Sequence, residues 1–116
     1  MTEPRTYQGI IPMLVYEDAP AAIAYLCRVF GFAERFRLPM PDGRLGHAEL
    51  TYGNGVLMLA SAYPEMGLVS PQELPVRHAQ VSVYVEDVDS RHAHAVAEDA
   101  TITAAVEDQF YGDRNY

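Results

Sequence analysis

The stretch Tyr16-Glu17-Asp18-Ala19 recurs 69 residues further along the chain as Val85-Glu86-Asp87-Val88. Each stretch closes an apolar run with strand character and places an aspartate where it can cap the helix that follows. The same offset places Ala24 on Ala93. Because the order of strand, acidic cap, helix and strand occurs twice, the sequence predicts two copies of a β-α-β-β-β unit and therefore an α+β fold.

The first copy carries a local signal for each of its elements. Residues 9–16 are apolar and are predicted to form a strand, after which Pro20 lies in the first turn of a helix. An apolar stripe at helical spacing follows, and Gly31 ends that helix. Three more strands are predicted at residues 32–38, 46–52 and 55–61, the last two joined by the hairpin dipeptide Gly53-Asn54.

The second copy is predicted to be incomplete. Its strands are expected at residues 78–85 and 101–106, on either side of a helix at residues 87–99. The third strand of the first copy begins near His47, and the offset of 69 carries this position to Tyr116, the last residue. We therefore expect a second module that is truncated after its second strand. Either the last two strands of this module are absent from the chain, or a partner chain covers the exposed edge of the sheet. The predicted organisation is a single domain over residues 1–116, with module one at about 7–62, a connector at 63–76 and module two at 77–116.

Composition and charge narrow the class of partner. The 116 residues form one domain's worth of chain with 49% hydrophobic residues and a formal net charge of −8, and all eight basic residues are arginines. An acidic chain repels phosphate backbones, so no nucleic-acid partner is expected. The longest apolar runs are far shorter than the roughly 20 residues of a membrane span, so no membrane partner is expected either. A single cysteine and a polar N-terminus without an apolar signal segment predict a cytoplasmic protein.

Several motifs resemble those of one protein family. Val29-Phe30-Gly31-Phe32 at the first helix end and Val83-Tyr84-Val85-Glu86-Asp87-Val88-Asp89 in the second copy are similar to the vicinal-oxygen-chelate superfamily, which includes glyoxalases, extradiol dioxygenases and bleomycin-resistance proteins. Stretches similar to its PhnB-like or bleomycin-resistance-like branch are residues 46–50, 56–59 and 107–114. The resemblance implies paired modules that curl into an open, cup-shaped barrel. It also implies small-molecule binding in the cup, usually by a homodimer.

The resemblance also implies where a divalent metal would be bound. Metal-dependent members take ligands from the first and fourth strands of each module, and these positions fall on Ile11, Met58 and Gln80, with the fourth beyond Tyr116. Isoleucine cannot coordinate a metal, and a thioether is a poor ligand for a hard divalent ion. We therefore predict no glyoxalase-type metal centre. A divalent metal nevertheless remains a possible cofactor. The remaining candidate ligand is His78, which lies two residues from Gln80.

Other polar side chains are candidates for a different site. His47 and Glu49 share one face of the third strand, and His78 shares a face with Gln80, so His47, Glu49 and His78 are candidate acid–base residues if both faces line the cup. The alternative for His47 and Glu49 is a solvent-facing position on a half-exposed strand. Candidate ligand-binding residues that could instead be ordinary core residues or polar strand positions are Tyr16, Met58, Gln80, Tyr84, Phe110 and Tyr111.

Three functions are compatible with these residues. The first is a small-molecule-binding protein without the glyoxalase-type metal, similar to the antibiotic-resistance proteins that sequester bleomycin. The second is a divalent-metal-dependent lyase, isomerase or dioxygenase of the same superfamily. The third is a non-catalytic dimerisation module. In each case we expect a C2 homodimer, the commonest symmetric assembly.

Overall fold

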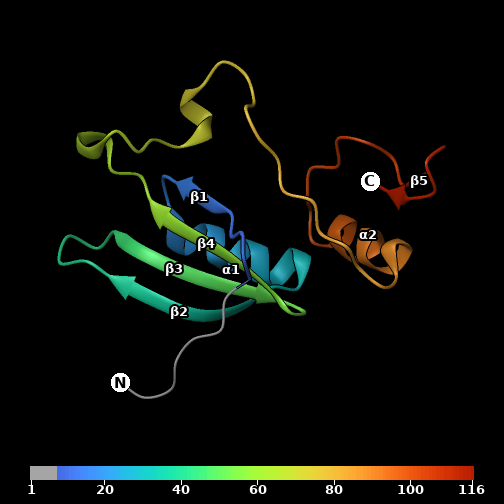
Figure 1. Ribbon diagram of the computed structural model, residues 1–116, viewed down its shortest axis with the longest axis horizontal. Helices are drawn as coiled ribbons and strands as arrows, with labels where there is room; N and C mark the ends of the chain where they lie inside the picture. Colours follow the sequence, from blue (N-terminus) through green and yellow to red (C-terminus); the bar gives the residue numbers. More distant parts are fainter. Residues whose placement is uncertain (1–7) are drawn as a thin grey trace.

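The computed structural model describes residues 8–116, so the first residues of the predicted domain, 1–7, lie outside the described residues. Its first part is a sheet covered on one face by a helix, and its last part contains a second helix and a short hairpin (Figure 1). In chain order the elements are β1 (Met13–Tyr16), α1 (Ala19–Phe30), β2 (Ala33–Pro39), β3 (Leu45–Tyr52), β4 (Gly55–Ser61), η1 (Pro64–Met66), η2 (Pro71–Glu73), α2 (Val88–Ala97), β5 (Glu107–Asp108) and β6 (Arg114–Asn115).

The four long strands form one mixed sheet in the order β1-β4-β3-β2. β1 runs parallel to β4, whereas β4, β3 and β2 are joined by antiparallel pairs. Gly53 adopts a φ of +58° in the turn between β3 and β4, a conformation in which glycine carries no steric penalty. The predicted α+β class, the first β-α-β-β-β unit and its Gly53-Asn54 hairpin are confirmed.

Local capping explains where α1 begins and ends. The Asp18 side chain accepts a hydrogen bond from the backbone N–H of Ala21 at 3.1 Å, which satisfies one of the free donors of the first turn. Gly31 closes the helix in the left-handed conformation with a φ of +77°. The helix therefore spans the region that the apolar stripe predicts.

The hydrophobic core lies between α1 and one face of the sheet. Its buried residues are Ala19, Ile23, Leu45, Ala48, Leu50, Leu57 and Leu59. Cys27 of α1 packs against this cluster and remains partly exposed. Burial, helped by the negative charge of Glu34, raises the pKa of the Cys27 thiol. Among residues 8–116, no helix is long and apolar enough to cross a membrane.

The second helix repeats the start of the first. Asp87 caps α2 by accepting a hydrogen bond from the Ser90 N–H at 3.0 Å, 69 residues after the capping bond of Asp18. α2 packs on α1, where Val29 and Ala95 are both fully buried. The His94 imidazole donates from Nε2 to the Arg28 carbonyl oxygen at 2.8 Å across the same contact. The predicted helix of the second copy is confirmed.

The predicted strands of the second copy are wrong. Residues 78–85 and 101–106 form no strands, and the chain instead closes a hairpin of β5 and β6. An extended segment becomes a strand only when a neighbour pairs with its N–H and C=O groups. Residues 78–84 are exposed and pair with no segment of the described chain. The sheet is therefore not closed into a barrel, although its open form is compatible with a cup.

Replacing Gly31 with alanine is expected to lower the free energy of unfolding by about 1–2 kcal/mol because an L-residue is strained in the left-handed region. The added methyl group would also meet Nη2 of Arg91 from α2, which must then move. Gly67 is the matched control because it has the same φ of +77° and nothing within 4 Å of an added Cβ. Urea unfolding of both alanine variants measures the difference. Equal losses would show that Arg91 moves aside without cost.

Candidate ligand-binding site

A β-bulge in β2 builds the polar centre of the sheet face that lies away from α1. Glu34 pairs with Leu50 and Phe36 pairs with Glu49, so Arg35 is an extra residue between two consecutive partners on β3. A bulge places two residues opposite one and re-aims a side chain. The side chains of Arg35 and Phe36 consequently both reach the face that carries Glu49 and His47.

These four residues form what we call the Glu49 cluster: Arg35, Phe36, His47 and Glu49. Glu49 is only 1% exposed, and its Oε1 accepts from Nε of Arg35 at 3.0 Å and lies 2.9 Å from Nη2. Its other oxygen, Oε2, lies 2.9 Å from Nε2 of His47. The Phe36 ring lies 6.1 Å from the His47 ring. A buried carboxylate is tolerated because charged and hydrogen-bonding partners replace its water.

The structure thus brings His47 and Glu49 together, and Glu49 does not face solvent. The sequence analysis did not identify Arg35 as a candidate, because strict strand alternation places it on the same face as Arg37. The position of a bulge cannot be recognised from a single sequence. The His47 side chain is 28% exposed and that of Arg35 is 32% exposed. Both can therefore offer hydrogen bonds to a molecule on this face while they hold the carboxylate beneath them.

An apolar row continues the Glu49 cluster across the sheet. Met58 of β4 is the register partner of Glu49 on one side and of Met13 on the other. Directly opposed residues in neighbouring strands point to the same face, so the row runs from a polar end to two thioethers. Met58 is partly buried and Met13 is 47% exposed. The face therefore offers a polar anchor beside a deformable apolar surface.

The residues at the expected metal-ligand positions do not fit a glyoxalase-type metal centre. Ile11 and Met58 supply no oxygen or nitrogen donor, and Gln80 lies on an exposed segment outside the sheet. The carboxylate of Glu49 already faces the positive charge of Arg35, which opposes a second cation beside it. Within residues 8–116, no group of three His, Cys, Asp or Glu side chains is arranged to hold a metal ion.

Tyr16 lies on the other face of the sheet, where it packs against the core below α1. Burial raises the pKa of its phenol. It also borders an open cleft of about 310 Å³ whose other lining residues are Glu17, Asp18, Ser70, Pro71 and Gln72. The structure therefore separates Tyr16 from Met58, with which it was expected to share a ligand surface.

The remaining candidates lie in the C-terminal part of the chain, beside α2 and away from the Glu49 cluster (Figure 1). His78, Gln80 and Tyr84 occupy the exposed segment before α2. Phe110 is 99% exposed in the turn between β5 and β6, where its ring lies 5.1 Å from that of Tyr111. Within one copy, these side chains do not meet His47, Glu49 or Met58.

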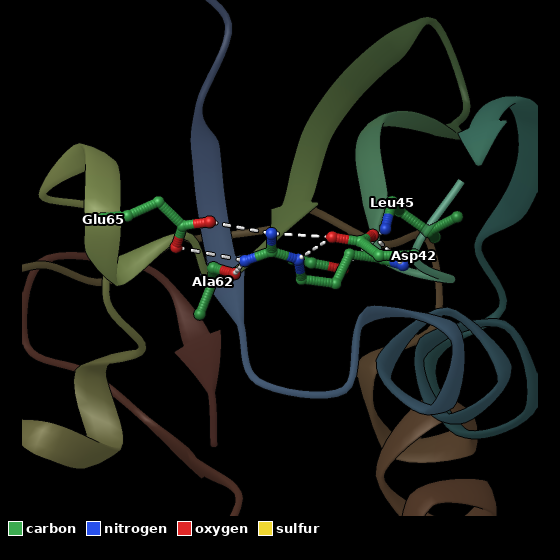
Figure 2. A network of polar contacts seen from close by, with 6 residues as sticks. Asp42, Leu45, Ala62 and Glu65 are labelled. Carbon is green, nitrogen blue, oxygen red and sulfur yellow. Dashed lines mark hydrogen bonds and ion pairs between the residues drawn. The ribbon is translucent and has the colours of Figure 1, made fainter. Parts of the chain in front are cut away.

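A second polar network fixes the connector that follows β4. The Arg44 guanidinium lies between the carboxylates of Asp42 and Glu65, at 2.7 Å and 2.8 Å from their nearest oxygens (Figure 2). It also stacks 3.8 Å from the centre of the Tyr63 ring and donates to the Ala62 carbonyl at 3.4 Å. This network ties the turn between β2 and β3 to η1. It therefore helps to position the connector that lines the cleft beside Tyr16.

The Arg44 network is expected to make stability depend on acidic pH. Hydrogen bonds from Arg44 hold the pKa of Asp42 below its ordinary 3.8 and that of Glu65 below its ordinary 4.5. A lowered carboxyl pKa adds stability that is fully present above the ordinary value and is lost as pH falls through the lowered one. Urea midpoints of the native chain and an Arg44→Met variant should therefore differ by a constant amount above pH 4.5 and converge below pH 3.8. A difference independent of pH would assign the effect to the Tyr63 stacking instead.

Comparison with known proteins places the chain in a family. Residues 11–116 match the family described as Glyoxalase/Bleomycin resistance protein/Dioxygenase superfamily. The chain belongs to this superfamily. It is 36% identical over 109 residues to the uncharacterized protein Mb0911c of Mycobacterium bovis, a match that covers 91% of this chain and 72% of that protein. A Mycobacterium tuberculosis relative, Rv0887c, is equally similar, and this chain spans 64% of its length.

Two solved structures are similar in fold. TioX from Micromonospora sp. ML1 superposes with a TM-score of 0.65 at 25% identity, covering 92% of this chain and 85% of that one. A lactoylglutathione lyase from Agrobacterium tumefaciens gives a TM-score of 0.61 at 21% identity, covering 97% and 84%. The similarity to the lactoylglutathione lyase shows a shared fold and nothing about activity. Superfamily membership supports a small-molecule-binding protein.

Proposed function

We propose that the chain binds a flat small molecule on the sheet face that carries the Glu49 cluster, without a glyoxalase-type metal centre. The observation that carries this proposal is the row of Glu49, Met58 and Met13 in register across three strands. It joins a fixed polar group to an exposed apolar surface, which is the composition of small-molecule sites. Membership of the superfamily supports the same reading.

The chemistry of the row favours a ligand with an oxygen atom at one end of an apolar body. Arg35 can donate hydrogen bonds to a carbonyl, phenolate or quinone-like oxygen, and His47, whose Nε2 contacts the Glu49 carboxylate, offers its other ring nitrogen to a polar group beside that oxygen. Met58 and Met13 contact the body of the ligand, since thioethers adapt their shape and make favourable contacts with aromatic rings. The formal net charge of −8 disfavours a highly anionic ligand at long range, so a neutral or cationic molecule fits best.

A thermal-unfolding screen with quinone-like and cationic aromatic compounds tests the proposal. A bound compound should raise the unfolding midpoint, and above its Kd the shift should grow with the logarithm of its concentration. His47→Ala should weaken the binding of that compound about tenfold. The control variant His92→Ala removes a histidine that contacts Tyr116, and it should leave the affinity unchanged. The proposal is wrong if neither class of compound shifts the midpoint, or if His47→Ala leaves the affinity unchanged.

Two other functions remain as outcomes of defined measurements. A divalent metal retained in stoichiometric amount through dialysis, and lost in His78→Ala, would favour a metal-dependent lyase, isomerase or dioxygenase. A stable dimer without any ligand response would favour a non-catalytic dimerisation module.

As part of the same proposal we assign the chain to the PhnB-like or bleomycin-resistance-like branch and to the cytoplasm. The similarity of residues 107–114 supports the branch, and the single cysteine supports the compartment.

A further inference from the structure

His47 has a defined arrangement of protons on its two ring nitrogens. Its Nε2 lies 2.9 Å from Oε2 of Glu49, whose other oxygen lies 2.9 Å from Nη2 of Arg35. A carboxylate paired with a guanidinium is ionised and can only accept hydrogen bonds, so Nε2 of His47 is the donor. In a neutral imidazole the other nitrogen, Nδ1, then carries a lone pair and no proton. His47 is therefore held in a tautomer whose second nitrogen can act as a base.

Nδ1 belongs to the part of His47 that reaches the open face of the sheet. The side chain is 28% exposed, and its Nε2 end is held against a carboxylate that is only 1% exposed. The exposed part of the ring is therefore the part away from Nε2, which includes Nδ1. Arg35 reaches the same face with 32% of its side chain exposed. Its guanidinium carries five N–H donors in a fork, more than one carboxylate oxygen can take.

We propose that the Glu49 cluster is an enolisation site for aromatic ketones, in which His47 is the base. Arg35 holds the carbonyl oxygen, and Nδ1 of His47 removes a proton from the carbon next to that carbonyl. The electron pair of the broken C–H bond forms a C=C bond, and the π pair of the carbonyl moves onto the oxygen as an enolate. Return of a proton from the imidazolium to the same carbon restores the ketone, so no oxidant, reductant or co-reactant is consumed.

The charges of the cluster match the charges that develop during this step. The oxygen becomes negative beside the Arg35 guanidinium, and the imidazole becomes positive against the Glu49 carboxylate. Both stabilising groups are held in place by their contact with each other before a ligand binds, so they need little reorganisation during the reaction. Glu49 is buried, and a charge away from water acts more strongly on its neighbours than an exposed one.

The apolar row beside the cluster explains the preference for an aromatic body. Met58 and Met13 follow Glu49 in register on β4 and β1. Neighbouring strands lie about 4.8 Å apart, so the row from Glu49 to Met13 spans about 10 Å. A row of this length accommodates two fused rings against the thioethers, with the carbonyl at the end next to Arg35. The inference rests on the proposed function, because the same row binds the ligand.

Hydrogen–deuterium exchange of 2-tetralone in D₂O tests the proposal. This bicyclic ketone carries a pair of protons between its carbonyl and its aromatic ring, and the native chain should accelerate their exchange above the rate in buffer, as followed by proton NMR. His47→Gln replaces the donor toward Glu49 but has no basic nitrogen, so the protein-dependent rate should fall at least 100-fold. The control His92→Gln alters a histidine that contacts Tyr116 and should keep the rate. The native rate in His47→Gln, or no exchange with the native chain, would overturn the proposal.

The composition of the chain removes a competing route to the same exchange. Lysine amines form Schiff bases with ketones, and such adducts also lose protons from the neighbouring carbon. All eight basic residues of this chain are arginines, so no lysine can act in this way. The terminal amine is shared by the native chain and both variants. Its contribution therefore cancels in the comparison of their rates.

Glu49 is a positioning residue in this scheme, and Glu49→Gln tests that role. Arg35 has donors only, so the new amide oxygen must face Arg35 and the amide N–H groups must face His47. Nε2 then accepts a hydrogen bond and the proton of the imidazole moves to Nδ1, which can no longer act as a base. We expect kcat for exchange to fall at least 100-fold while KM changes less than threefold. An unchanged kcat would overturn the assignment.

Chemical rescue and binding complete the test. Free imidazole should restore exchange in His47→Ala, where the side chain is missing, more than in His47→Gln, where the glutamine fills the space. Equal effects of imidazole on the two variants would count against a base at this position. A thermal shift with 2-tetralone but no exchange would overturn enolisation and leave the ligand site intact. Absence of a shift with every compound of the screen, 2-tetralone included, would overturn the proposed function as well.

Discussion

Replacing Arg35 with leucine is expected to lower the free energy of unfolding by about 3 kcal/mol, since removing one partner of a buried ion pair leaves an uncompensated charge. The Glu49 carboxylate is 1% exposed and accepts from Nε of Arg35, so it cannot recover full hydration when the guanidinium is lost. His47 retains its contact with Oε2, which keeps the loss below that of a fully isolated carboxylate. Urea denaturation at neutral pH measures the effect.

The ion pair between Arg37 and Glu34 is the matched control for this prediction. Its N–O distance is 2.7 Å, but its side chains are 36% and 35% exposed. Arg37→Leu should therefore cost about 0–1 kcal/mol, as surface pairs do. The double variant Arg35→Leu with Glu49→Leu should recover much of the stability, because an apolar pair needs no solvation. If Arg35→Leu and Arg37→Leu lower the free energy of unfolding by the same amount, the burial of Glu49 does not determine how much its ion pair contributes to stability.

Truncation of Leu59 to alanine is expected to have a similarly large effect, about 3–4 kcal/mol, because it removes buried methyl groups and leaves a cavity. Leu59 is fully buried in the middle of β4, among the residues that face α1. Leu38→Ala is the control with the same chemistry on β2, where the side chain is 47% exposed. It should cost less than about 1 kcal/mol, since much of that side chain stays in water in the folded state.

Denaturant midpoints and slopes of both leucine variants check this expectation. A reduced midpoint with an unchanged slope would mean that stability fell while the folded and unfolded states kept their compactness. A loss below about 1 kcal/mol for Leu59→Ala would mean that α1 closes over the space and that the core is less tightly packed than its burial indicates.

The elements that the sequence predicts well are those set by neighbours along the chain. Asp18 and Asp87 were expected to cap helices, and each does so through a bond to a residue three positions later. The Gly53-Asn54 turn similarly specifies the hairpin of β3 and β4. These features depend on a few adjacent residues, so a pattern in one sequence is enough to find them.

The features that the sequence did not predict depend on partners far along the chain. Residues 78–85 have the composition of a strand, yet pairing requires a neighbour that periodicity cannot supply. The contact of Arg35 with Glu49 follows from one extra residue in β2, and the position of a bulge depends on how two strands meet. That His47 and Glu49 lie on one face could be predicted because simple alternation on β3 was enough to place them there.

Cys27 gives the chain a native position from which to follow the motion of α1. It is the one cysteine of the sequence, it is partly exposed, and its surroundings suppress the reactive thiolate. Alkylation should therefore proceed slowly in the closed state and quicken whenever the helix lifts from the sheet. The rate of labelling then reports local opening of this helix, and its dependence on denaturant separates that opening from unfolding of the whole chain.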